Sequence, residues 1–145
     1  MKGKSKMLLD TDFYEKNIQY FDENIRKIFN GDMMKISEEK HFEHMGNFTL
    51  VYKYIPYEYT VNIESEFRVF NIIFKDSEGA SNVLYRVKKY NTELCEKNII
   101  ESLSILKDVL EQNNFNMYLY IDDKIYVKNK HGIKRVKDIS SLSNG

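Results

Sequence analysis

The 145-residue chain is 42% hydrophobic and 30% charged. This composition excludes global disorder and favours one domain over residues 1–145, ordered over roughly residues 10–139 with frayed termini. Its 22 basic and 22 acidic residues cancel, which excludes a general attraction to polyanions. A single cysteine excludes an internal disulfide framework. No stretch approaches the ~20 apolar residues of a membrane span, so we expect a cytoplasmic protein.

The first predicted element is an amphipathic helix that ends near residue 31. Asp12 followed by Glu15 resembles a capping pair at its start. Asn30-Gly31 predicts its end, because glycine accepts the left-handed backbone conformation found there. Between these signals, apolar residues recur at spacings of four and three and form one stripe: Tyr14, Ile18, Phe21, Ile25 and Ile28.

The middle of the chain predicts a four-stranded antiparallel meander. Residues 31–47 fit either a short helix capped by Ser37 or an early strand. Beyond them, short turns join runs whose apolar residues alternate or are nearly continuous, as in half-buried and central strands. The four predicted strands cover residues 48–55, 57–64, 67–75 and 83–90. Four tyrosines on either side of the single proline are predicted to line the core: Tyr52, Tyr54, Tyr57 and Tyr59.

A second amphipathic helix is predicted over roughly residues 92–113, capped by Asn91 or Thr92. Its apolar stripe contains Cys95, Ile99, Leu103, Leu106 and Leu110, and we expect Cys95 to be buried there. Two or three short strands follow, with turns at Asp122-Asp123 and around Gly132. The predicted fold class is α+β, with two helices packed on one face of an antiparallel sheet, in the order α-β-β-β-β-α-β-β(-β).

The sequence contains few patterns typical of catalysis or metal binding. His41 and His44 lie three residues apart among glutamates and are weak candidates for metal ligands, because no third ligand is defined. Glu64 and Glu66 could form a carboxylate pair, but they flank a predicted strand turn and nothing indicates a cleft, so a solvated strand edge is the favoured interpretation. The six glycines are scattered and form no phosphate-binding loop. We therefore expect no enzyme activity and no cofactor.

The C-terminal segment combines tyrosines with basic residues and is the predicted partner-binding region. Tyr118, Tyr120 and Tyr126 are expected to project from the same face as Lys124 and Lys128. Such a face can be an ordinary solvated sheet surface, a protein interface or a nucleic-acid platform. The candidate binding residues are Tyr118, Tyr120, Tyr126, Lys124, Lys128, Lys130, Lys134 and Arg135.

These features favour a non-catalytic module that inhibits or neutralises another protein. The order of elements resembles that of toxin-immunity and phage anti-defence proteins, and chaperones of secreted effectors share a related order. Nucleic-acid binding, and a small enzyme or ligand-binding domain with a pocket between helix and sheet, are the alternatives. Because residues 67–75 are apolar on both faces, we also expect a homodimer if the sheet does not curl around its own core.

Overall fold

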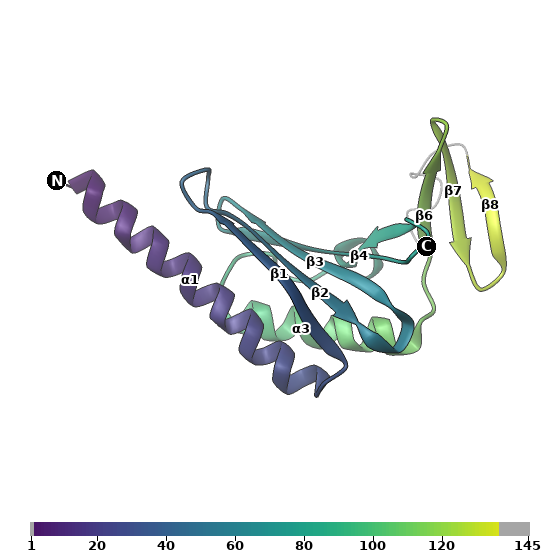
Figure 1. Ribbon diagram of the computed structural model, residues 1–145, viewed down its shortest axis with the longest axis horizontal. Helices are drawn as coiled ribbons and strands as arrows, with labels where there is room; N and C mark the ends of the chain where they lie inside the picture. Colours follow the sequence, from purple (N-terminus) through teal and green to yellow (C-terminus); the bar gives the residue numbers. More distant parts are fainter. Residues whose placement is uncertain (1, 137–145) are drawn as a thin grey trace.

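The computed structural model describes the backbone of residues 2–136 and the side chains of residues 10–136. Two long helices, α1 (Lys2–Phe29) and α3 (Glu96–Gln112), pack on one face of an eight-stranded antiparallel sheet (Figure 1). The strands pair in chain order, from β1 at one edge to β8 at the other. The predicted α+β class and the shared helix face are therefore confirmed.

Short elements complete this topology. The turn between β2 and β3 contains the 3-10 helix η1 (Ile55–Tyr57), and the short helix α2 (Leu84–Val87) follows β5. The eight strands are β1 (Met33–His41), β2 (Asn47–Tyr54), β3 (Tyr59–Glu66), β4 (Val69–Lys75), β5 (Ser81–Val83), β6 (Met117–Ile121), β7 (Lys124–Asn129) and β8 (Gly132–Val136). Residues 31–47 thus contain a strand rather than a helix. The tail after residue 139, predicted to fray, lies outside the described residues.

Helix α1 buries its predicted stripe against the sheet. Tyr14, Ile18, Phe21 and Ile25 are buried, and Phe29 extends the stripe by one turn. The helix ends as predicted, with Asn30 and Gly31 at positive φ. Its predicted start is wrong, because the helix begins at Lys2, before the Asp12 and Glu15 pair. A capping pair has no orphan amides to satisfy inside a continuous helix.

Helix α3 packs beside α1 on the same face of the sheet. Its predicted stripe of Ile99, Leu103, Leu106 and Leu110 is fully buried. Cys95, however, is exposed and occupies the N-cap position with an extended backbone. Its predicted burial is therefore wrong, because the helix begins one residue later and the side chain precedes the first helical turn. The predicted caps Asn91 and Thr92 lie upstream of the helix start for the same reason.

The predicted strand over residues 83–90 is wrong for most of its length. Only Val83 belongs to a strand, and the chain then turns through α2. Leu84 and Val87 lie one helical turn apart, so both face the core, where Leu84 is buried and Val87 packs against it. Tyr90, beyond the end of α2, is also buried there. Beyond this excursion the chain returns to β4, where the Phe70 N–H donates to the Thr92 carbonyl at 2.8 Å.

The tyrosines around Pro56 divide into core and surface residues. Tyr52 and Tyr54 are buried on β2 as predicted. Tyr59 is partly buried, and its hydroxyl donates to the Asn113 side-chain oxygen at 2.5 Å. Tyr57 is 45% exposed, which contradicts the prediction for that residue. Its position in η1 rather than on β3 removes it from the strand alternation.

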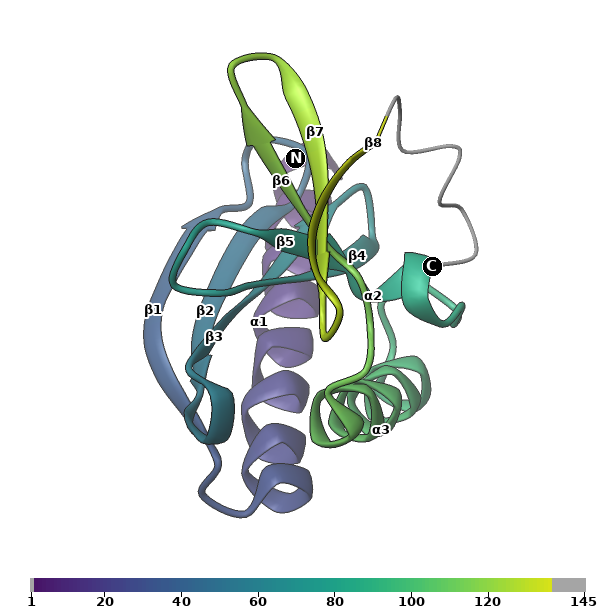
Figure 2. The same ribbon diagram turned by 90° about the vertical axis from the view of Figure 1, so that its right-hand side faces the viewer.

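Strands β6, β7 and β8, termed here the C-terminal sheet, extend beyond the main sheet (Figures 1 and 2). Their ladder connection to the rest of the sheet is the single pair Ser81 and Tyr118. Lys128 on β7 adds ion pairs to Asp76, at 2.8 Å, and to Glu78 in the β4–β5 loop. The C-terminal sheet is therefore held to the body by few contacts and presents much of its surface to solvent.

Candidate functional site

The two-residue turn at Asp122-Asp123 sets which side chains of the C-terminal sheet share a face. It pairs Ile121 with Lys124, and therefore Leu119 with Tyr126 and Tyr118 with Val127. Directly opposite residues of an antiparallel pair project to the same side. Tyr126 consequently lies on the opposite face from Tyr118 and Tyr120. The expectation that these three tyrosines share a face is wrong.

Two of the predicted binding residues are occupied within the chain. Tyr118 is buried, and the Arg86 guanidinium lies over its ring at 5.2 Å from the centroid. Lys128 donates hydrogen bonds to the carboxylates of Asp76 and Glu78, and these bonds, chiefly the one to Asp76, raise its pKa. Both residues therefore connect the C-terminal sheet to the body instead of forming an open surface.

The remaining open surface combines apolar side chains with unpaired cations. Tyr126 lies opposite Arg135 across β7 and β8, and Lys124 precedes Tyr126 by two residues on the same face. Ile121 and Ile133 are 45% and 55% exposed. Within the described residues, neither Lys124 nor Arg135 forms an ion pair. We call this surface the basic face, which consists of Ile121, Lys124, Tyr126, Ile133 and Arg135.

The other predicted binding residues surround the basic face without belonging to it. Tyr120 is 59% exposed on the opposite side of β6. Lys134 projects to that opposite side from β8, and Lys130 is exposed in the turn between β7 and β8. Positive charge is thus present on both faces of β8. This arrangement was predictable from the sequence, because the two-residue length of the Asp122-Asp123 turn determines the register between β6 and β7.

The structure does not assemble a metal site around the two candidate histidines. His41 ends β1 and His44 lies in the following turn, so the pair is not on a helix. Their ring centroids are 6.5 Å apart. No group of three or more His, Cys, Asp or Glu residues suited to a metal occurs among the described residues.

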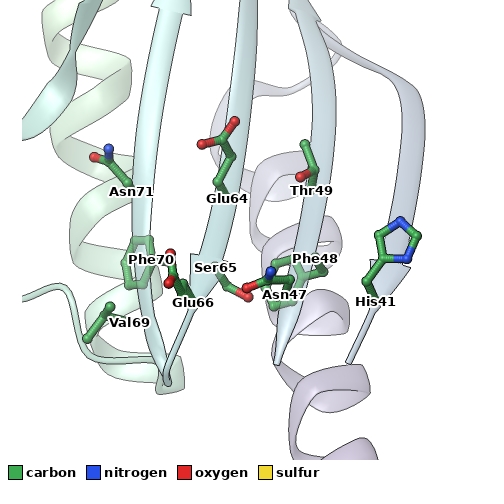
Figure 3. A pocket seen from close by; sticks show the side chains of 10 residues that line it. All are labelled: His41, Asn47, Phe48, Thr49, Glu64, Ser65, Glu66, Val69, Phe70 and Asn71. Carbon is green, nitrogen blue, oxygen red and sulfur yellow. The ribbon is translucent and has the colours of Figure 1, made fainter. Parts of the chain in front are cut away.

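Glu64 and Glu66 line a shallow depression of about 420 Å³ on the sheet face opposite the helices (Figure 3). Thr49, Glu64 and Asn71 form one row across β2, β3 and β4, with His41 at the edge. Neither carboxylate has an ion-pair partner among the described residues. The space between the sheet and the helices, where a ligand pocket was the alternative expectation, is filled by core side chains such as Phe21, Phe74 and Leu103.

No known protein family model, curated protein or solved structure matches this chain. Within the described residues, no helix is both long enough and apolar enough to cross a membrane.

Proposed function

We propose that the protein is a non-catalytic cytoplasmic binding protein that inhibits or neutralises another protein, as toxin-immunity or anti-defence proteins do, by docking an acidic surface of it on the basic face. The observation that carries this proposal is the combination on paired strands of exposed Ile121 and Ile133 and half-buried Tyr126 with Lys124 and Arg135, which form no ion pair within the described residues. Aromatic residues and arginine are enriched in interface cores, where they supply much of the binding free energy.

The composition of the basic face supports a protein partner over nucleic acid. Binding of single strands uses successive aromatic rings on which bases stack. Tyr126 is the one aromatic residue of the basic face, because Tyr118 and Tyr120 project from the other side. Ile121 and Ile133 add aliphatic surface, which suits an apolar contact on a protein partner better than a phosphate backbone.

Recovery of the protein from its native host tests this proposal. We expect a stoichiometric protein partner at physiological salt, and we expect Lys124→Glu/Arg135→Glu to lose it. The matched control is Lys89→Glu/Lys97→Glu, which reverses two exposed lysines away from the C-terminal sheet and should keep the partner. Nuclease treatment should leave the complex intact.

Three results would count against the proposal. Recovery of the protein alone would contradict a stable partner. Retention of the partner by Lys124→Glu/Arg135→Glu would contradict the assignment to the basic face. Release of bound material by nuclease, together with affinity that falls steeply with salt, would favour the nucleic-acid alternative.

A further inference from the structure

The two edges of the eight-stranded sheet differ in how well they can accept another strand. At β1 the register shifts between Lys35 and Ser37, so Ile36 forms a bulge. Bulges disturb the ladder and protect an edge from pairing. At β8 all five residues pair with β7 in one uninterrupted register. No described strand covers the outer side of β8.

The charges around β8 define what kind of strand can pair there. Residues 124–136 contain five lysines or arginines and no acidic residue: Lys124, Lys128, Lys130, Lys134 and Arg135. Lys134 and Arg135 are consecutive on a strand, so they project to opposite faces. A strand beside β8 therefore meets a cation on each of its own faces. Two consecutive acidic residues satisfy both cations.

The same charges oppose pairing between two copies of this chain. An antiparallel pair of β8 strands brings the Lys134-Arg135 segments of both copies close together. Like charges across a strand pair destabilise it. The occupant of this edge is thus a different protein rather than a second copy.

We infer that the partner adds an extended segment with consecutive acidic residues to the outer edge of β8. This inference rests on the proposed function and specifies the partner. Backbone hydrogen bonds supply the pairing, and alternate side chains supply the selectivity, as in other strand additions. The segment continues the basic face of β6, β7 and β8 by one strand, so its side chains on that face lie beside Ile133 and Arg135.

The probe is a short synthetic peptide in which two consecutive glutamates are flanked by threonine and valine on both sides. At low salt we expect the bound peptide to slow amide exchange in β8 but not in β1. Hydrogen exchange measured by NMR detects this difference. Lys134→Glu/Arg135→Glu should weaken binding by about tenfold or more, and a peptide with lysine in place of glutamate should not bind.

Two N-methylated peptides separate strand addition from simple charge attraction. In a strand at the edge of a sheet, every second N–H group points toward the neighbouring strand. Methylation of the N–H groups that point toward β8 should abolish binding, and methylation of those that point away should not. Both methylated peptides are tested on the unmodified protein, so a misfolded variant cannot affect this comparison.

Equal binding of both methylated peptides, or no protection of β8 at millimolar peptide, would overturn the inference. Stronger protection of the same amides by a thymidine oligonucleotide would do so as well. If the native partner is still lost by Lys124→Glu/Arg135→Glu while β8 stays unprotected, strand addition fails and the proposed function stands.

Discussion

The ring of Tyr14 occupies the space that a side chain on residue 46 needs. A Cβ placed on Gly46 falls well inside contact distance of the Tyr14 ring atoms. Gly46 also has a φ of +69°, in the left-handed region. Tyr14 is itself held in place, because it is buried and stacks on Phe42 at a centroid distance of 5.5 Å. The β1–β2 turn can therefore reach α1 because residue 46 lacks a side chain.

The Gly46→Ala variant should lower the free energy of unfolding by about 2–4 kcal/mol, from left-handed strain and overpacking together. Gly31→Ala is the matched control, since Gly31 also has positive φ but no heavy atom within 4 Å of its Cβ position. Gly31→Ala should lower the free energy of unfolding only by the cost of left-handed backbone strain. Urea denaturation measures both, and equal losses would contradict a packing role for Gly46.

Asparagine substitutions at the two residues of the β3–β4 turn should change the stability of the protein in opposite directions. Phe67 and Arg68 have φ values of 52° and 64°, a conformation that favours asparagine and glycine. Phe67 is 64% exposed, so Phe67→Asn should stabilise the protein by about 0.5–1 kcal/mol.

Arg68→Asn should destabilise the same turn. The Arg68 guanidinium lies 2.7 Å from Asp10 and 4.2 Å from the Phe13 ring centroid. These contacts hold the turn against α1. Their loss should cost more free energy than asparagine gains by relieving the left-handed backbone strain at residue 68. Thermal denaturation of both variants checks the signs, and two shifts in the same direction would refute this account.

Loss of the Lys128 ion pairs should loosen the C-terminal sheet without unfolding the body. We expect Lys128→Met to speed amide exchange in β6 and β7 by roughly fivefold, equivalent to about 1 kcal/mol. Amides of β2 and β3 should keep their exchange rates. Lys124→Met, which removes an exposed lysine from the same strand, is the control and should leave all rates unchanged. Faster exchange throughout the sheet would indicate a single cooperative unit instead.

Alkaline pH should destabilise the protein through two buried tyrosines. Burial, with a smaller contribution from the hydrogen bond to Asp22, strongly raises the pKa of Tyr52. Burial also raises the pKa of Tyr90 to about 12. Above pH 10 the unfolded chain loses these protons while the folded chain keeps them, so stability falls as pH rises, by about 1.4 kcal/mol per pH unit for each proton.

Tyr52→Phe should reduce the slope of unfolding free energy against pH above pH 10 by the contribution of about one proton. Tyr90→Phe should reduce this slope chiefly between pH 10 and 12. At neutral pH, Tyr52→Phe should cost about 1 kcal/mol for the lost hydrogen bond. Urea denaturation at a series of pH values gives the slopes. Identical slopes for Tyr52→Phe and the unmodified protein would rule out Tyr52 as the cause.

Long periodic patterns were predictable because burial repeats over many residues. The stripes of α1 and α3 and the alternation of β2, β3 and β4 all extend over several turns or residue pairs. Strand β1 was ambiguous because it is an edge strand, mostly exposed on both faces. The bulge at Ile36 also resets its alternation, so no single period describes it.

Errors arose where a short-range detail decided the structure. Leu84 and Val87 occur at helical spacing within a β-rich run, and tertiary packing selected the short helix α2. On the C-terminal sheet, the two residues of the Asp122-Asp123 turn reverse the parity between β6 and β7. The contribution of Ile121 and Ile133 to the basic face follows from that register and not from composition.

The weak attachment of the C-terminal sheet has an evolutionary consequence. Of the side chains on β6, β7 and β8, Met117 belongs to the main hydrophobic core and Leu119 packs against it. Exposed positions on these strands can therefore change with little effect on folding of the body. If the basic face binds a partner, as we propose, it can diverge rapidly between lineages while the packing of α1 and α3 on the sheet stays the same.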